Sequence, residues 1–403
     1  MDGPCTSTSP ASAPRAAAPQ RFLSSLRPHG LWTAPLAAVA LYAWVVARLA
    51  AAAGGDVSAL VCAGDRYRPP QTVRDHVRIL QRSHGYDGQF FLFAALDPFA
   101  AREGAHHMDV PAYRYQRILY PWLAALLAGG RVAHLPWAMV AVNVLAMAGG
   151  TFATAAFCRR HAVSPWWSLF YASMSGLLLA TARDLSEPLA TALLTASLAA
   201  WAARRGGWVA GWLALACLAR ETSAVMAPVL CADLWFRRRD RGGAAAVAAA
   251  LLPFGAWQAY LSWRFRMPPW RGGQQNLGRP LAALWDHAAD VFAGAPPHSP
   301  IERAFLAVFV ATACVAAGLA VREVLRRRDA VTVGLLAFSI LPFVMTHKVW
   351  VEPWSYARVL VTGAVFLLLA FARSRDRVYL LPLAAHAVLF VLALRWLGVL
   401  EPG

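Results

Sequence analysis

The chain has 403 residues, of which 59% are apolar and 15% charged, and its formal net charge is +17. Soluble domains contain about 45–50% apolar and about 25% charged residues, so this composition excludes an ordinary soluble domain. Apolar runs of about 20 residues recur from end to end, and each is long enough to cross a hydrocarbon core of roughly 30 Å. Because backbone polar groups in lipid must be paired within their own segment, we predict an all-α polytopic membrane protein.

The positive charge is distributed in short arginine clusters between the apolar runs. No aromatic-basic platform accompanies these clusters, which argues against nucleic acid as a partner. Short connectors rich in arginine are typical of cytoplasmic loops. The clusters are Arg159-Arg160, Arg204-Arg205, Arg237 to Arg241, Arg322 to Arg328 and Arg373 to Arg377.

The chain begins with a segment, 1–30, that is rich in proline, alanine and serine and carries three arginines. We interpret it as a disordered cytoplasmic tail. The next run, 31–53, is too long for the core of a signal peptide, so we expect it to remain as a membrane anchor.

Placing every arginine cluster in the cytoplasm predicts on which side of the membrane each loop lies. The first span then runs outward, and eleven spans place every cluster inside. Two long loops, 54–134 and 263–300, fall outside. The predicted spans are 31–53, 135–157, 166–182, 186–203, 208–218, 221–236, 244–262, 301–321, 330–345, 355–372 and 377–398.

The apolar stretch from Ile118 to Ala128 is not a span in this count. It is short, and Gly129-Gly130-Arg131 ends it, so we interpret it as a re-entrant or interfacial helix on the outer face. The competing interpretation makes it a twelfth span. A twelfth span would invert the chain on one side of this stretch and place either the N-terminal arginines or all later clusters outside.

Charged residues outside the clusters collect at the outer ends of the predicted spans. Charges that interrupt apolar segments are costly and by default mark a functional site, so we expect these side chains to converge on the outer face. They are Asp87, Asp97, Arg114 and Arg117 in the first loop, Arg183, Asp184 and Glu187 in the next outer turn, Arg220 and Glu221 in the third, and His347, Lys348, Glu352 and Arg358 near the last.

Most of these residues could also have a purely structural role. Asp87 lies between an aromatic residue and a glycine just before an apolar helix, so it could be the N-cap of that helix without losing a catalytic role. Asp97 precedes a proline and could stop a helix. Local ion pairs could account for Arg183-Asp184 and Arg220-Glu221, headgroup contacts for His347, Lys348 and Arg358, and interfacial anchoring for Arg114 and Arg117.

Group transfer from a lipid-carried phosphate donor suits this layout. A carboxylate at the bilayer surface can take a proton from an acceptor hydroxyl. Arginines hold phosphate through bidentate, charge-assisted hydrogen bonds. Aromatic residues at span ends, such as Trp350, Trp354 and Tyr356, could line a groove for the lipid tail, although an interfacial aromatic belt explains them equally well.

The first loop carries motifs that resemble those of a known family. Gly85-Tyr86-Asp87-Gly88-Gln89-Phe90-Phe91, then Leu96-Asp97-Pro98, then the run from Tyr113 to Pro121 resemble the first outer loop of GT-C-type membrane glycosyltransferases, most closely a bacterial branch linked to cell-surface glycopolymer formation. Two later blocks, Arg183 to Pro188 and Ala219 to Thr222, also resemble that branch. The resemblance covers roughly residues 31–262, whereas 301–398 resemble only a generic helical tail.

The resemblance implies a fold and a reaction. The fold is a seven-helix module, 31–262, with long outer loops after helices 1 and 7, the second of them 263–300, followed by a C-terminal helical membrane region, 301–403. The reaction is transfer of a sugar from a polyprenyl-phosphate-linked donor to a cell-envelope glycan or lipid acceptor, on the outer face of a bacterial inner membrane. Members often carry two adjacent acids in the first loop, whereas Asp87 stands alone here.

The resemblance also implies roles for the site residues. The catalytic acid maps onto Asp87, with Asp97 as the second choice. Some relatives bind a divalent metal, but no cluster here has metal-ligand spacing, so we predict no metal and no other cofactor. The candidate donor-phosphate contacts are Arg114, Arg117, Arg220, Arg358, His347 and Lys348, and the candidate orienting or acceptor-binding residues are Gln89, Tyr115, Asp184, Glu187, Glu221 and Glu352.

Two other functions remain open from the sequence: a transporter or flippase for a lipid-linked glycan, and a non-catalytic membrane subunit of a glycopolymer assembly complex. Transporters usually place polar residues near the bilayer midplane on broken helices and are built from inverted repeats. This chain instead places its charges at one end of the predicted spans, and it has no evident internal repeat.

Overall fold

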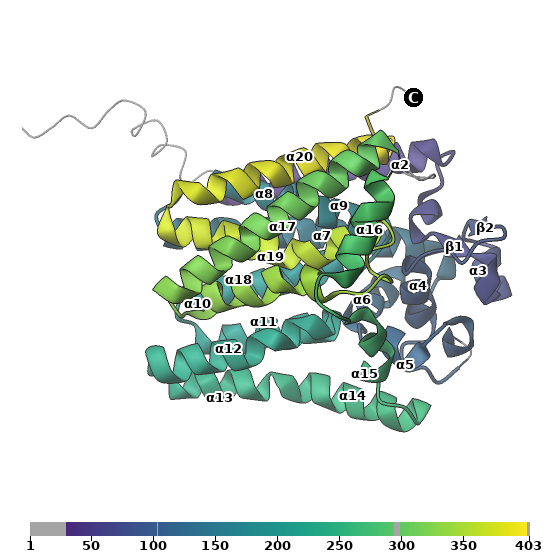
Figure 1. Cartoon of the computed structure of the whole chain (residues 1–403). Coiled ribbons are helices and arrows are strands. Elements are labelled where there is room, and N and C mark those ends of the chain that lie inside the picture. The colour runs from purple at the N-terminus through teal and green to yellow at the C-terminus, as the bar shows by residue number, and fades with distance from the viewer. Residues whose placement is uncertain (1–29, 103, 294–298, 401–403) are drawn as a thin grey trace, which may run out of the picture.

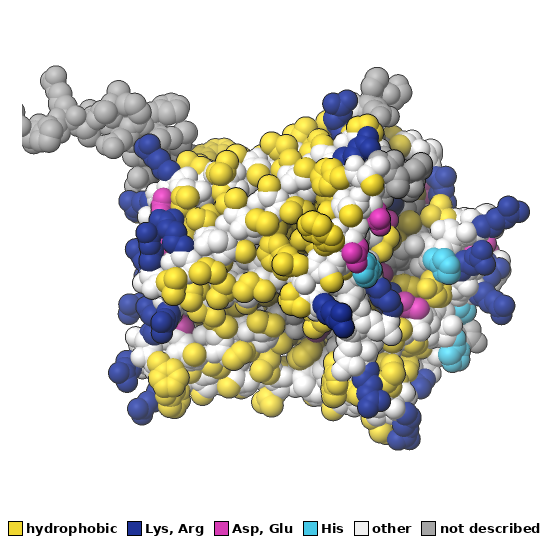
Figure 2. All heavy atoms as spheres, in the orientation of Figure 1, with side chains coloured by type: hydrophobic (Ala, Val, Ile, Leu, Met, Phe, Trp, Pro, Cys, Tyr) yellow, Lys and Arg dark blue, Asp and Glu magenta, His cyan; other side chains and the backbone are white. Residues whose placement is uncertain are grey.

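The computed structural model describes residues 30–102, 104–293 and 299–400. The long helices lie side by side as a bundle, and short helices cover one end of it (Figure 1). We call this the loop end, because it carries most of residues 54–131 and 266–293. We call the opposite end the arginine end, because arginine side chains gather there with few acids on the face that Figure 2 shows.

Six helices in the described residues are long and apolar enough to cross a membrane. With 20 to 29 residues each, at about 1.5 Å per residue they match a hydrocarbon core of roughly 30 Å. They are typical of a multi-pass membrane protein. They are α2 (Gly30–Ala52), Val132–Arg160 (η4, Val132–His134, and α7, Leu135–Arg160), Arg241–Phe265 (α13, Arg241–Ala249, and α14, Leu251–Phe265), α17 (Pro300–Arg326), α19 (Pro353–Ser374) and Arg377–Trp396 (η10, Arg377–Tyr379, and α20, Leu380–Trp396).

The prediction of eleven spans is therefore wrong. The other five predicted segments form helices that are shorter or broken. At about 1.5 Å per residue, none of their helices exceeds roughly 24 Å. Three are single helices followed at most by a short turn: α10 (Glu187–Ala202), α11 (Gly206–Ala219) and α18 (Ala330–Ile340) with η9 (Leu341–Val344). Two are divided, into η5 (Pro165–Ser168), α8 (Leu169–Ala172) and α9 (Ser175–Thr181), and into η6 (Glu221–Val225), α12 (Met226–Ala232) and the π-helical turn η7 (Asp233–Arg237).

The stretch interpreted as re-entrant or interfacial forms α6 (Leu119–Ala128). Its 10 residues extend over only about 15 Å, so this helix is too short to cross the bilayer. It ends at Gly129, which adopts the left-handed conformation (φ 58°) that favours glycine after a helix.

The loop end contains the only strands in the described part of the chain, and otherwise the fold is all-α. The two strands pair in parallel, with Ala63 opposite Ile79 and Gly64 opposite Leu80. The elements of the loop end are η1 (Val57–Val61), β1 (Ala63–Gly64), η2 (Asp65–Tyr67), α3 (Gln71–Arg74), β2 (Ile79–Leu80), α4 (Gly88–Leu96), η3 (Gly104–His107), α5 (Pro111–Arg114), α15 (Trp270–Gly273), η8 (Gln274–Asn276) and α16 (Ala282–Phe292).

Both long connecting segments meet at the loop end. The amide of Asn276 donates to the hydroxyl of Tyr113 at 3.2 Å, and the amide of Gln116 donates to the carbonyl of Pro269 at 3.5 Å. Within the bundle, α10 lies between α7 and α11, and α19 packs against α9 and α18. This packing places the first turns of α10 and α19 and the last turn of α11 beside the loop end (Figure 1).

Two glycines allow close backbone contacts at the loop end, one within it and one with the bundle. Gly85 has a φ of +64°, and a Cβ there would lie 2.5 Å from the carbonyl oxygen of Cys62. A Cβ on Gly88, the first residue of α4, would lie 2.4 Å from the carbonyl oxygen of Arg183 and 2.6 Å from that of Val61. Real Cβ atoms do not approach backbone this closely, so glycine at position 88 fixes where α4 starts.

We expect Gly88→Ala to lower the free energy of unfolding by about 1–3 kcal/mol, because the added methyl group must push α4 away from two carbonyl groups. The measurement is the thermal unfolding of the detergent-solubilised full chain. Gly149→Ala is the matched control, since a Cβ at Gly149 has open space around it and lies inside α7. Equal unfolding temperatures for the two variants would show that α4 does not depend on this approach.

Candidate functional site

Asp87 precedes the first residue of α4, yet its side chain does not cap that helix. Instead, each carboxylate oxygen accepts a hydrogen bond from a different arginine. Arg114 Nη1 donates to Oδ1 at 2.9 Å, and Arg358 Nη1 donates to Oδ2 at 3.2 Å. The two arginines come from α5 and α19, so Asp87 joins the loop end to the helix bundle. The side chain of Asp87 is 22% exposed.

Arg358 also connects Asp87 to a second acid. Its Nη1 lies 3.2 Å from Oε1 of Glu187, the first residue of α10. Glu187 is 1% exposed and forms a further ion pair with Arg220, the residue that ends α11. A carboxylate at a helix N-terminus is favoured by the helix dipole, which helps to hold Glu187 in this buried position.

Two bidentate ion pairs flank this chain of contacts. Arg114 Nε and Nη2 donate to the two carboxylate oxygens of Asp109, both at 2.8 Å. Arg117 Nε and Nη2 donate to the carboxylate of Glu221 at 2.9 and 2.7 Å. Arg117 Nη2 also donates to the hydroxyl of Tyr113 at 2.8 Å. Both arginines are therefore held in a fixed geometry by a forked contact.

The pair of Arg117 with Glu221 belongs electrostatically to the same network. The charge of Arg117 favours the charged forms of both Asp87 and Glu187, so it lies within electrostatic range of both carboxylates. Four acids and four arginines thus form one network, in which the formal charges cancel.

Aromatic rings fix the orientation of three guanidiniums. Arg114 lies 4.2 Å above the ring of Phe90, and Arg358 lies 5.3 Å from the centre of the Tyr86 ring. Arg183 lies 3.9 Å above the ring of Trp354. In the described residues no carboxylate is within ion-pair distance of Arg183. Its charge interacts with Glu352 at longer range. Arg183 is therefore a cation at the site without a paired acid among those residues.

The acids of the network are held in the charged form. Burial alone would raise the pKa of Asp87, but Arg114 and Arg358 outweigh burial and hold this pKa well below its ordinary value. Burial of Glu221 is likewise outweighed by Arg117, which lowers the pKa of Glu221 to about 2. The pKa of Glu187 is also lowered, because Arg220 and Arg358 overcome the effect of its burial.

The depressed pKa of Glu221 gives a testable pH dependence. The ion pair with Arg117 contributes stability that is fully present above the ordinary carboxyl pKa of 4.5 and is lost as the pH falls toward about 2. We expect the wild type to unfold at a higher temperature than Glu221→Gln from pH 7 down to about 5, and this difference to shrink below that pH. A difference that stays constant between pH 5 and pH 3 would contradict the pair.

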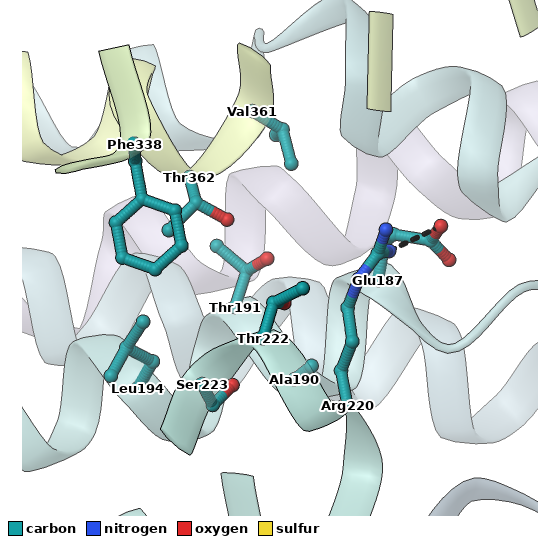
Figure 3. A pocket seen from close by; sticks show the side chains of 10 residues that line it. All are labelled: Glu187, Ala190, Thr191, Leu194, Arg220, Thr222, Ser223, Phe338, Val361 and Thr362. Carbon is teal, nitrogen blue, oxygen red and sulfur yellow. Dashed lines mark ion pairs between the residues drawn. The ribbon is translucent and has the colours of Figure 1, made fainter. Parts of the chain in front are cut away.

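A small cavity adjoins the network at Glu187 and Arg220. Its volume is about 10 Å³, roughly the room for one water molecule. Figure 3 shows the side chains of Arg220 and Glu187 pointing toward each other, with the hydroxyls of Thr191, Thr222 and Thr362 nearby. A larger hollow of about 440 Å³ lies at the other end of α4, beside Phe93, Leu96 and Asp97.

Of the predicted site residues, the structure brings Asp87, Arg114, Arg117, Glu187, Arg220, Glu221 and Arg358 into one network, with Glu352 close to it. The predicted local pairs Arg183-Asp184 and Arg220-Glu221 do not form among the described residues. Arg220 instead pairs with Glu187, and Glu221 pairs with Arg117.

Other predicted site residues hold the loop end together. Both carboxylate oxygens of Asp97 accept backbone N–H groups, from Ala101 and Arg102, at 2.9 Å each. Asp97 is separated from Asp87 by the whole of α4, about 14 Å at 1.5 Å per residue. Gln89 binds the backbone of Gly64 and His84, and Tyr115 donates its hydroxyl to the carbonyl of Asp97.

The last three predicted residues have partners outside the network. Asp184 is fully buried with Asn143 as its polar neighbour, and burial raises the pKa of its carboxyl well above the ordinary value. His347 forms an exposed pair with Asp286 at 3.3 Å. Lys348 binds the side-chain oxygen of Gln275.

Asp109 and Tyr113 are not among the predicted site residues, and Arg183 is predicted to lie with the other charges on the outer face but without a role in binding or catalysis. Arg183 stands in a block that resembles the family, but a local pair with the adjacent Asp184 was an equally simple explanation. Asp184 adopts a positive φ of 49° and turns into the interior, which leaves Arg183 on Trp354. Asp109 and Arg114 lie close together in the sequence on either side of Pro111, and this short spacing is the sequence feature that could have indicated their pairing.

In the residues that the structure describes, no group of three or more histidine, cysteine, aspartate or glutamate side chains is placed to hold a metal ion.

No family model, curated protein or solved structure matches this chain. The structure establishes a helical protein with six long apolar helices among the described residues, typical of a multi-pass membrane protein. Its function is proposed from the site and from the motifs of the first loop.

Proposed function

We propose that this chain is an integral-membrane glycosyltransferase of the GT-C type. It transfers a sugar from a polyprenyl-phosphate-linked donor to a cell-envelope glycan or lipid acceptor, on the extracytoplasmic face of a bacterial inner membrane. The observation that carries this proposal is the carboxylate of Asp87, held between Arg114 and Arg358 at one end of the helix bundle.

The orientation is proposed from the charge at the two ends of the bundle. At the arginine end, arginine side chains hydrogen-bond to the backbone of neighbouring connectors. Arg237 donates to the carbonyl of Arg328, and Arg375 donates to the carbonyl of His161. Connectors with such an excess of arginine face the cytoplasm. The loop end, where residues 54–116 contain equal numbers of acids and of lysine or arginine residues, then faces outward with the Asp87 network.

The proposed reaction uses groups that the network contains. The acceptor oxygen forms a bond to the anomeric carbon of the sugar as the bond between that carbon and the phosphate oxygen breaks. Asp87 takes the proton of the acceptor hydroxyl. The polyprenyl phosphate departs with the bonding electron pair, and guanidiniums stabilise its charge.

The proposal is tested with the full chain in lipid vesicles that contain polyprenyl-phosphate-linked sugars labelled in the sugar. The account predicts that label leaves the polyprenyl carrier and enters an acceptor glycan or lipid. Label that crosses the bilayer while still attached to its carrier would instead establish a transporter. Label that neither moves nor transfers across a panel of sugars and acceptors would exclude both activities for the isolated chain.

A further inference from the structure

The ion-pair network has no spare charge with which to receive a phosphate. Its four carboxylates (Asp87, Asp109, Glu187 and Glu221) balance its four guanidiniums (Arg114, Arg117, Arg220 and Arg358). An arriving phosphate would add at least one negative charge in a partly buried place. Uncompensated charge is costly there, so an anion can be accepted only if one carboxylate gives up its arginines or a further cation takes part.

Asp87 is the carboxylate that can be replaced at least cost. Asp109 and Glu221 are each held by a bidentate pair with one arginine, and Glu187 is almost completely buried. Asp87, in contrast to Asp109 and Glu221, receives one hydrogen bond from each of two arginines, and its side chain is more exposed than that of Glu187. Fork-like pairs are stronger than single contacts, so the Asp87 contacts are the ones that exchange.

The same two arginines can accept a phosphate once Asp87 moves away. Arg358 contacts both Asp87 and Glu187 through Nη1, and its guanidinium has five N–H donors, so it can bind a further oxygen. Arg183 supplies a cation that has no paired acid in the described part of the chain, held in place by Trp354. Glu352 lies within electrostatic range of both Arg183 and Arg358, so these two cations share one region.

We propose that the phosphate of the donor displaces Asp87 from Arg114 and Arg358, so that the base becomes free only when the donor is bound. This inference rests on the proposed function, because it names the event that frees the catalytic base of the same site. While both arginines hold Asp87, its lowered pKa makes it a weak base. Exchange of the two guanidiniums onto phosphate removes the main cause of that lowering.

The test measures binding of farnesyl phosphate to the purified full chain in detergent, from the shift in its thermal unfolding temperature. Asp87→Asn removes the charge that competes for the arginines, so we expect this variant to bind the probe about three- to tenfold more tightly than the wild type. Asp87→Ala provides a second variant with the same expectation. Unchanged or weaker binding in both variants overturns the exchange.

Three controls accompany this measurement. Asp75→Asn makes the same change of charge at an exposed acid of the same loop, whose carboxylate binds only Gln71 among the described residues, and should leave the affinity unchanged. Arg358→Gln should weaken binding. Farnesol, which lacks the phosphate, should show no preference among the variants. If the variants rank in the same order of affinity for farnesol as for farnesyl phosphate, the probe reports insertion of its apolar tail, and the exchange is refuted.

The outcome separates this inference from the proposed function. If Asp87→Asn binds farnesyl phosphate more tightly but the wild type transfers no sugar, the exchange is correct and the glycosyltransferase proposal fails. If transfer depends on Asp87 but the affinity for farnesyl phosphate is the same in Asp87→Asn and the wild type, the enzyme proposal survives and the exchange is refuted.

Discussion

Asp87→Asn is expected to reduce sugar transfer by about 10²–10⁴-fold, the range that a positioned general base contributes. Asparagine keeps the size of the side chain but cannot take a proton from the acceptor hydroxyl. Its amide oxygen can still accept from one arginine, and α4 does not use the Asp87 side chain as a cap. We therefore expect the variant to insert into the membrane and to accumulate as the wild type does.

The measurement is the initial rate of label transfer in vesicles, at equal amounts of folded protein and with the labelled donor at saturation. Saturation matters because the variant is also expected to bind the donor phosphate more tightly than the wild type. Asp75→Asn serves as the matched control and should retain the wild-type rate. Full transfer by Asp87→Asn would remove Asp87 from the catalytic role.

Glu187→Gln is expected to give the largest loss of stability, about 3–5 kcal/mol. Glu187 is 1% exposed and is the acid that both Arg220 and Arg358 contact. Its replacement leaves the partly buried Arg220 without a paired carboxylate among the described residues and leaves Arg358 with Asp87 alone. Breaking one partner of a buried ion pair is costly because the remaining charge stays away from water.

A double-mutant cycle tests this explanation. Arg220→Gln in the Glu187→Gln background removes the stranded charge, so the double variant should lose less stability than the sum of the two single variants. Glu352→Gln is the control, since Glu352 forms no ion pair in the described residues, and it should shift the unfolding temperature only slightly. Strictly additive losses from Glu187→Gln and Arg220→Gln would contradict the buried pair.

The sequence was sufficient for the fold class but not for the helix count. Hydropathy identified the long helices, for example α17 and α19, because they are both apolar and uninterrupted. The segments 166–182 and 221–236 are also apolar, but both are broken into short helices, and most of 171–182 is buried inside the bundle. Apolar composition does not distinguish a side chain that faces lipid from one that packs inside a bundle.

The sequence also grouped several charged residues at one end of the bundle, but it did not give their pairing. Charges next to turns indicated Glu187, Arg220 and Glu221, since such charges interrupt apolar runs. Adjacent residues were considered as pairs, whereas consecutive side chains at a helix end point in different directions. The actual partners, Arg220 with Glu187 and Arg117 with Glu221, lie 33 and 104 residues apart, which local sequence cannot show.

The role of Asp97 illustrates a further limit. It stands in a motif of the resemblance and was the second choice for catalysis. In the structure both of its oxygens bind backbone N–H groups of the following turn, so it shapes the chain beside the larger hollow. An acid in a loop motif can serve either purpose, and only its partners distinguish the two.

The most direct test of the account is an electron cryomicroscopy structure of the full chain in a lipid nanodisc with a bound polyprenyl phosphate. We predict the phosphate oxygens at about 2.7–2.9 Å from guanidinium nitrogens of Arg114 and Arg358, with Asp87 turned away from both. A phosphate bound at the arginine end, or beside Asp97 with the Asp87 ion pairs intact, would contradict it.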